Sequence, residues 1–147
     1  MMRMSTKGHH AIRILVYLTN TPDRPVNKAE IGESQGISTG YVQQLMLRLT
    51  SAGLVRSHRG KEGGFSLSRP ADEITVRQVL EATEGSFELA PCVNPRQCCI
   101  RTPVCPAHPL WIQASNYVNE LFDGTTMADL AATGHTLEEE EQQRQES

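Results

Sequence analysis

The stretch "ISTGYVQQLMLRLTSAGLVRSHRGKEGGFSLSRP", residues 37–70, predicts a helix followed directly by a β-hairpin. Ser38 can cap the helix and Gly53 can close it. The apolar residues of the helix recur at helical spacing and form one inward face: Val42, Leu45, Met46 and Leu49. The segments "LVRSH" and "FSLS" then alternate apolar and polar residues on either side of the glycine-rich turn "RGKEGG". This alternation is typical of a hairpin.

Two segments before this stretch complete a helix-turn-helix. Residues 6–20 have a helical apolar face made by Ala11, Ile14, Leu15 and Leu18. After the break "TPDRP", Asn27 can cap a short helix, with Glu30 in the capping-box position and Gly36 at the end. A helix-turn-helix followed by a hairpin is a winged helix. The expected fold class is therefore mainly α with a small β-hairpin: a winged helix-turn-helix DNA-binding domain plus a long dimerisation helix.

The chain after the hairpin predicts three more helices. Thr75 with Gln78 forms a capping box that opens the first, and Thr126 with Asp129 opens a short last one. Between them a helix begins after Pro109 and carries one apolar stripe: Trp111, Ala114, Val118, Leu121 and Phe122. This stripe either packs on the winged helix or pairs with a second copy. A two-fold dimer would match a palindromic operator.

Charge is distributed unevenly along the chain. Residues 1–69 carry ten Lys/Arg and four Asp/Glu, a balance of +6, whereas residues 70–147 carry four and thirteen, a balance of -9, which together give the net charge of -3. A basic first half suits a polyanion such as double-stranded DNA. The acidic end, "LEEEEQQRQES", has one apolar residue, so residues 135–147 are expected to be a disordered tail.

Candidate DNA-contacting residues lie early in the second helix of the helix-turn-helix and in the hairpin. The N-terminal end of that helix enters the major groove in such proteins. Small residues there allow close approach to phosphates, glutamines can bind adenine edges, and basic residues at a hairpin tip suit a narrow minor groove. The alternative to DNA contact is that the two helices form an ordinary helical hairpin with a polar face and that the charged turn is simply solvated. The candidates are Ser38, Thr39, Gly40, Tyr41, Gln43 and Gln44 in the helix, with Arg56, His58, Arg59 and Lys61 in the hairpin.

All four cysteines lie in "CVNPRQCCIRTPVCPAH", residues 92–108. Five residues separate Cys92 from Cys98, six separate Cys98 from Cys105, and two separate Cys105 from His108. The closely spaced C-x2-4-C pairs of structural zinc sites are absent. Wide spacing in a proline-stiffened loop favours a larger group held by three thiolates and a fourth ligand, such as an iron–sulfur cluster. Zinc and metal-free redox thiols remain the alternatives.

The remaining sequence signals concern compartment and catalysis. No stretch approaches the ~18 consecutive apolar residues of a membrane span, and the first residues lack a signal-peptide cleavage site. A cytoplasmic protein is expected, and in a reducing compartment clustered cysteines indicate metal or redox chemistry rather than disulfides. No hydrolase elbow, HExxH, Rossmann fingerprint or paired-carboxylate arrangement is present. The protein is therefore not expected to be an enzyme.

Four stretches together resemble one known family: "MRMSTKGHHAIRIL", "ISTGYVQQLMLRLTSAGLVRSHRGKEGGFSLSRP", "ITVRQVLEATEG" and "CPAHPLW". They look like the IscR-like (Rrf-type) winged-helix iron–sulfur transcription regulators, and the resemblance covers residues 2–132. It implies a homodimer, a dimerisation helix near residues 110–122 and a cluster-binding loop before it. In the family's [2Fe–2S] members three cysteines and a histidine are ligands, which by position are Cys92, Cys98, Cys105 and His108.

The sequence departs from the family pattern by one extra residue between Cys92 and Cys105. Cys98 keeps the usual spacing from Cys92 and Cys99 keeps that to Cys105, so Cys99 is the alternative middle ligand. Nitric-oxide-sensing relatives hold a [4Fe–4S] cluster and use an N-terminal side chain of the partner subunit, and the matching position here is His9. The stretch "CPAHPLW" favours His108 and a [2Fe–2S] cluster.

The resemblance and the residues together give one interpretation of the whole chain. Residues 1–88 form the DNA-binding domain, residues 89–109 the cluster loop, residues 110–134 the dimerisation helix and short terminal helix, and residues 135–147 the tail. The protein is expected to be a dimeric transcription repressor, with no membrane or small-molecule substrate as a partner. The cluster would sense iron–sulfur, redox or nitric oxide status. The alternatives are an iron–sulfur electron-transfer protein and a zinc-stapled structural module.

Overall fold

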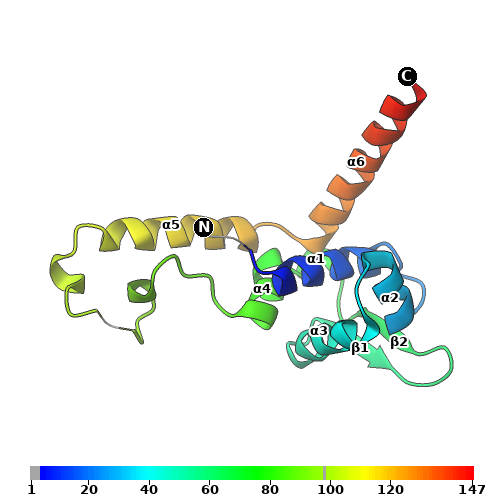
Figure 1. The fold of residues 1–147 in the computed structure, drawn as a ribbon, viewed down its shortest axis with the longest axis horizontal. Helices are drawn as coiled ribbons and strands as arrows, with labels where there is room; N and C mark the ends of the chain where they lie inside the picture. Colours follow the sequence, from blue (N-terminus) through cyan, green and yellow to red (C-terminus); the bar gives the residue numbers. More distant parts are fainter. Residues whose placement is uncertain (1–3, 98) are drawn as a thin grey trace.

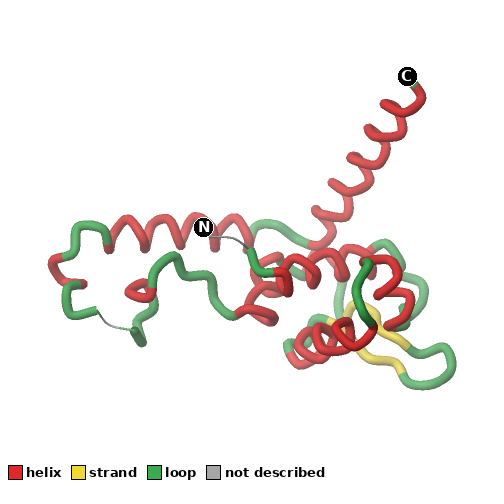
Figure 2. The backbone as a smooth tube through the Cα atoms, viewed as in Figure 1, coloured by secondary structure: helices red, strands yellow, loops and turns green. Residues whose placement is uncertain are grey.

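The computed structural model describes residues 4–97 and 99–147, and Figure 1 shows a helical body from which two further helices extend. Figure 2 shows that the strands form a single small hairpin in this body, which confirms the expected mainly α fold with a small β-hairpin. The elements in chain order are α1 (Thr6–Thr19), α2 (Lys28–Gln35), α3 (Thr39–Ser51), β1 (Val55–His58), β2 (Gly64–Leu67), η1 (Ala71–Glu73), α4 (Val76–Glu84), η2 (Pro91–Val93), η3 (Thr102–Val104), α5 (His108–Asp123) and α6 (Met127–Glu146).

Local capping signals define the helix-turn-helix formed by α2 and α3. The Asn27 side chain accepts a hydrogen bond from the backbone N–H of Glu30 at the start of α2, and Ser38 accepts one from Tyr41 at the start of α3. Gly36 ends α2 in the left-handed region at φ 67°. A Cβ at Gly32 would lie 2.7 Å from the carbonyl oxygen of Ile37, so the turn between the helices closes tightly on a glycine. The predicted helix-turn-helix is confirmed.

One apolar core holds the winged-helix body, which we define as residues 5–85. The inward faces of α1 and α3 are those predicted from helical spacing, and all of their apolar members are buried. The α4 helix adds Val76, Val79 and Leu80, and its predicted Thr75–Gln78 capping box is present. Met127, at the start of α6, is fully buried in the same cluster. The body is thus stabilised by contacts among its own side chains and the first turn of α6.

The hairpin is fastened to the rest of the body through the linker between α1 and α2. The antiparallel register joins Val55 to Leu67 and His58 to Gly64. Val26 and Phe65 exchange backbone hydrogen bonds of 2.9 and 2.8 Å, so the linker lies against β2 like a third strand. A Cβ at Gly64 would lie 2.5 Å from backbone atoms of Val26, and this close approach explains a glycine at the start of β2.

The segment from Ser86 to Asp123, which we call the cysteine arm, is built differently from the body. Its loop extends away from α4, and α5 returns toward the body (Figure 1). The arm is held along α5 by the Leu89 N–H, which donates to Ser115 Oγ at 3.1 Å, and by Asn119 Nδ2, which donates to the Phe87 carbonyl at 3.3 Å. The Phe87 ring meets that of Phe122 edge-on at 6.1 Å.

Only part of the predicted apolar stripe of α5 packs against the rest of the chain. Phe122 packs against the core, but Trp111 and Leu121 remain 39% and 65% exposed. The residue of α5 that is buried is Ser115, which binds the loop. The interpretation that the whole stripe packs on the winged helix is therefore wrong for Trp111 and Leu121. Two interactions along α5 are polar, and much of its apolar surface is left exposed.

The last helix is longer than predicted. The Thr126–Asp129 capping box begins α6 as expected, but the helix continues to Glu146 instead of ending early. Residues 135–146, expected to be disordered, are helical in the structure. Glutamate and glutamine are good helix formers, and Arg144 lies 3.6 Å from Glu141 one turn earlier. Among the described residues no helix is long and apolar enough to cross a membrane.

Candidate nucleic-acid interface and cysteine loop

The second helix of the helix-turn-helix presents most of its predicted DNA-contacting residues to solvent. Ser38, Thr39, Gly40 and Gln44 are exposed, and Gln43 is half-buried. A Cβ at Gly40 would meet nothing within 4 Å, so packing within the chain does not require a glycine there. A glycine that the fold does not need, at the N-terminal end of a helix, suits close approach to a phosphate. The arrangement can therefore serve as the end of a helix that enters a groove.

Tyr41 lies differently from the other predicted contacts of α3. Its ring packs partly against the core and meets the ring of His10 edge-on at a centroid distance of 5.5 Å. The Tyr41 hydroxyl lies 3.5 Å from His10 Nδ1. Desolvation, followed by the charges of Arg13 and His9, lowers the pKa of His10. Tyr41 therefore links α1 to the reading helix in addition to any contact with DNA.

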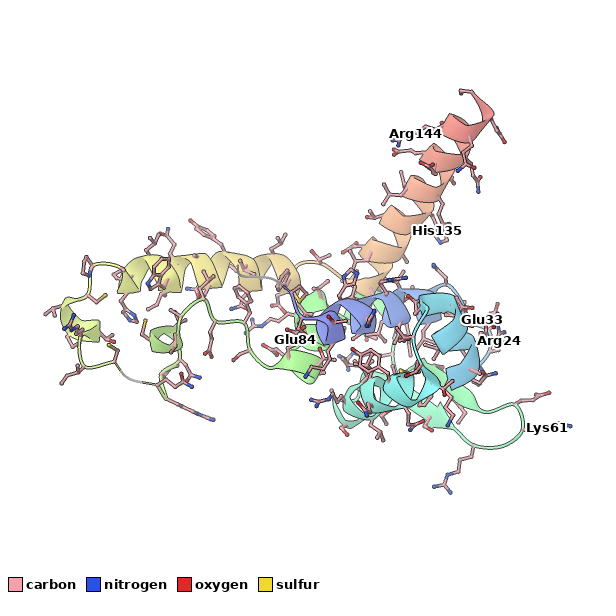
Figure 3. All side chains as sticks on the ribbon, in the orientation of Figure 1. Arg24, Glu33, Lys61, Glu84, His135 and Arg144 are labelled. Atoms are coloured by element: carbon pink, nitrogen blue, oxygen red, sulfur yellow. The ribbon has the colours of Figure 1, made fainter. Side chains whose placement is uncertain are left out.

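The basic residues of the hairpin divide into a base and a tip. Arg56 in β1 donates to the Ser68 carbonyl at 3.0 Å, and His58 lies 2.7 Å from Ser66 Oγ across the strands. Arg59 and Lys61 lie in the connecting turn and are exposed. Figure 3 shows the Lys61 side chain pointing away from the body at the end of the hairpin. The tip thus presents two long, exposed cationic side chains, whereas Arg56 at the base also stabilises the hairpin.

A polar network fixes α2 against α1. Arg24 binds both carboxylate oxygens of Glu30, at 2.6 and 2.9 Å, and the Tyr17 hydroxyl donates to the same carboxylate at 2.9 Å. These hydrogen bonds lower the pKa of Glu30, the one from Arg24 having the largest effect, and raise the pKa of Tyr17. The expected capping-box role of the Glu30 side chain is wrong, because Arg24 and Tyr17 engage it instead.

The cysteine loop, residues 92–108, carries its donors on a series of short backbone turns. Cys92 lies in η2, whereas Cys105 directly follows η3, and both side chains are half-buried. Cys99 is exposed, and its carbonyl accepts from Thr102 at 3.0 Å. Cys98 lies outside the described residues. Within residues 4–97 and 99–147, no three His, Cys, Asp or Glu side chains lie together as a metal site would require.

His108 is the first residue of α5 and lies three residues after Cys105. Its backbone N–H donates to the Cys105 carbonyl at 3.3 Å, which fixes the two residues close together. Its ring nitrogen Nδ1 is buried and has no hydrogen-bond partner among the described atoms. A buried nitrogen without a partner is costly unless something binds it. Together with the cysteines of the same loop, this imidazole makes a donor set whose chemistry fits an iron–sulfur cluster that has one imidazole ligand.

His9, the alternative fourth ligand, is exposed on α1 and its ring centroid lies 6.3 Å from that of His10. The structure also shows functional residues that sequence patterns missed. Ser115 and Asn119 hold the start of the cysteine arm on α5, and their only signal is two polar residues four apart on one helix face. They connect the cysteine loop to the helix that follows it.

A helix-turn-helix with a basic hairpin defines a winged-helix DNA-binding regulator. The family model described as "Rrf2: Iron-dependent Transcriptional regulator" matches residues 4–133, and the chain belongs to this family of transcriptional regulators. It is 38% identical over 132 residues to a candidate HTH-type transcriptional regulator, ORF2, of Azotobacter vinelandii, covering 89% of this chain and 80% of that protein. It is 33% identical over 138 residues to the HTH-type transcriptional regulator IscR of Pectobacterium carotovorum, covering 93% and 84%.

Two solved structures share the fold over most of the chain. CymR (YrzC), described as the global cysteine regulator of B. subtilis, has a TM-score of 0.75 and 30% identity, covering 90% of this chain and 98% of that one. IscR of T. potens has a TM-score of 0.74 and 29% identity, covering 90% and 88%. These relatives confirm the resemblance to IscR-like regulators and the expectation that the protein is not an enzyme.

Proposed function

We propose that this chain is a homodimeric, sequence-specific repressor that acts in the cytoplasm on palindromic DNA. Its affinity for DNA is set by an iron–sulfur cluster in the cysteine loop, and the cluster reports iron–sulfur, redox or nitric oxide status. The observation that carries the proposal is the buried Nδ1 of His108, which has no hydrogen-bond partner among the described residues, in a loop that carries every cysteine of the chain. The description of the family as iron-dependent supports it.

The DNA-reading part of the proposal assigns separate tasks to α3 and the hairpin. The N-terminal end of α3, from Ser38 to Tyr41, contacts phosphates, and Gln43 and Gln44 contact base edges in the major groove. The hairpin, with Arg59 and Lys61 at its tip and Arg56 at its base, contacts the adjacent minor groove. The exposure of the tip residues and the basic first half of the chain support this assignment.

The cluster would be held by Cys92, Cys105, His108 and one of the adjacent cysteines, Cys98 or Cys99. A bound [2Fe–2S] group supplies one-electron redox chemistry and four coordination bonds that tie the loop together. A [4Fe–4S] group with His9 of the second copy is the alternative form. Because the described donors do not yet lie together, coordination requires the loop to close.

Closing the loop affects DNA binding through the arm. The first residues of the arm follow α4 of the body directly and are hydrogen-bonded along α5 through Ser115 and Asn119. Closing the loop around a cluster would therefore act on both α4 and α5, because the loop is attached to α4 through these first residues and leads directly into α5. If α5 forms the dimer contact with its exposed apolar surface, from Leu110 to Leu121, the spacing of the two reading helices changes with the cluster.

The experiment that tests the proposal combines metal analysis with DNA binding. Anaerobically prepared protein should contain iron and inorganic sulfide and show a cluster absorption spectrum. Zinc without sulfide would support the structural module instead, and a cluster without DNA affinity would support an electron-transfer protein. Duplex binding should weaken with salt with a log–log slope of about -5 to -9, which corresponds to roughly 6–10 phosphates in the dimer. A slope near zero would overturn the assignment of a DNA-binding face.

A further inference from the structure

One large apolar side chain is exposed where the fold does not need it. Most exposed apolar side chains of the described residues lie in the cysteine arm, between Ile100 and Leu121. Leu47 is 58% exposed and lies instead on α3, the helix proposed to enter the major groove. The core face of α3 is filled by other residues: Val42, Leu45, Met46 and Leu49. A polar residue at position 47 would therefore leave the packing of α3 unchanged.

The position of Leu47 continues the stripe of predicted base contacts. Gly40, Gln43, Gln44 and Leu47 follow one another at i, i+3, i+4 and i+7, which is a helical stripe opposite to the buried face. Helices that read the major groove place their base-contacting residues at this same spacing. Leu47 is thus one turn beyond the two glutamines, and its side chain would follow theirs along the groove.

We propose that Leu47 contacts the 5-methyl group of one thymine in each half-site of the operator. Thymine is the base that presents an apolar group in the major groove, where the other base edges present hydrogen-bond donors and acceptors. The exposed residues beside Leu47 on α3 are polar and include one positive charge, since they are Arg48, Thr50 and Ser51, and this favours a polyanion over an apolar protein partner. The inference rests on the proposed entry of α3 into the major groove.

The test uses a duplex selected by the full-length protein from a random library. Each thymine is replaced in turn by deoxyuridine, which lacks only the 5-methyl group, at symmetric positions of both half-sites. At one position of each half-site, replacing thymine by deoxyuridine should weaken wild-type binding about fourfold for each methyl group removed, which is the effect expected for burying one methyl group. L47A should bind the thymine and deoxyuridine duplexes equally at that position.

The matched control is Leu137, which is 59% exposed on α6 and so resembles Leu47 in exposure and helical setting. L137A should keep the wild-type preference for thymine at every position. If L47A weakens binding but keeps the same thymine-to-deoxyuridine ratio at every position, or changes the oligomeric state instead, the inference about Leu47 is overturned. If the library yields no preferred duplex at all, the proposed DNA-reading function fails, and the inference falls with it.

Discussion

The winged-helix body and the cysteine arm of this protein are held together in different ways. In the body, side chains from α1, α3, α4 and the hairpin are buried against one another, and many are fully buried. In the arm, Ser115 is the buried residue among the described residues 86–97 and 99–123, while Trp111 and Leu121 are exposed. One region is stabilised by its own apolar contacts. The other leaves apolar surface exposed and contains a buried imidazole nitrogen that has no hydrogen-bond partner among the described residues.

This difference separates folding from regulation. A body with a complete core can keep one shape whether or not a cofactor is bound. We expect an arm with little buried surface to gain order from a bound ligand or a second copy, because segments of low local stability are the ones that respond to ligands. We therefore expect changes in the body to act on stability or DNA reading. Changes in the arm should act on the cluster and the dimer.

The largest effect is expected in the arm, from replacing Cys105 by serine. C105S should lose the cluster completely, because Cys105 has no adjacent cysteine in the sequence that could replace it. The body should keep its free energy of unfolding within about 0.5 kcal/mol, as expected for a change outside the core. Iron and sulfide analysis gives the first result and urea unfolding of the apo proteins gives the second. A large loss of stability in C105S would erase the distinction between the two regions.

The adjacent cysteines and the two candidate histidines provide controls for C105S. Single serine variants of Cys98 and Cys99 should retain much of the cluster, because either thiol can take the middle position, and the double variant should lose it. H108A should alter the spectrum and the redox potential. If H9A destroys the cluster while H108A leaves it unchanged, the fourth ligand comes from the N-terminal region and the [4Fe–4S] form is correct.

The second prediction compares two leucines, one from each region. Leu45 is 1% exposed in α3 and Leu121 is 65% exposed in α5. L45A should cost about 2–5 kcal/mol of unfolding free energy, because it leaves a cavity in the core. This cost should not depend on protein concentration. L121A should instead raise the dimer dissociation constant, which sedimentation measures. If both variants lost the same free energy of unfolding when measured as dilute monomers, the arm would have a core of its own.

The third prediction concerns base reading by the body. Q44A should cost about 1–3 kcal/mol on the preferred operator and little on random DNA, because a glutamine that binds a base edge carries sequence information. R59A should weaken binding most where the minor groove is narrow. Gln142, an exposed glutamine of α6, is the matched control, and Q142A should leave both affinities unchanged. If Q44A and R59A weaken all duplexes equally, the separate tasks of α3 and the hairpin are wrong.

Sequence patterns predicted the body well because its signals are local. The caps at Asn27 and Ser38, and the glycines that end or tighten the turns, each act within a few residues. The apolar faces of α1 and α3 point to one core, so helical spacing alone selects their buried residues. Glu30 is the exception in the body. Its partner Arg24 lies in an irregular linker, where no periodic pattern exists to reveal the contact.

The arm was predicted less well because its apolar residues are not the ones that hold its loop against α5. Apolar spacing predicts a packed stripe on α5 that includes Trp111 and Leu121, yet the contacts that hold the loop come from Ser115 and Asn119. Apolar spacing gives no information about which partner covers a face. The length of α6 was missed for another reason, since a low apolar content suggested disorder although glutamate-rich segments also have high helix propensity.

The smallest effect is expected from the polar network in the body, and it tests whether apolar packing dominates there. E30Q removes the carboxylate that Arg24 and Tyr17 bind. The lowered pKa of Glu30 means that the folded state binds this proton less tightly than the unfolded chain does. Its stabilisation is therefore present above the ordinary pKa of 4.5 and is lost as the pH falls through the lower folded value.

At about pH 7, E30Q should have a slightly lower urea midpoint than the wild type, because partly exposed ion pairs contribute little to stability. The difference should disappear in acid, when the wild-type carboxylate also becomes protonated. Glu33 lies on the same helix (Figure 3) and is exposed, so E33Q is the matched control and should keep a urea midpoint close to that of the wild type. If E30Q lost as much free energy of unfolding as L45A, the polar network would contribute as much to the stability of the body as the core does.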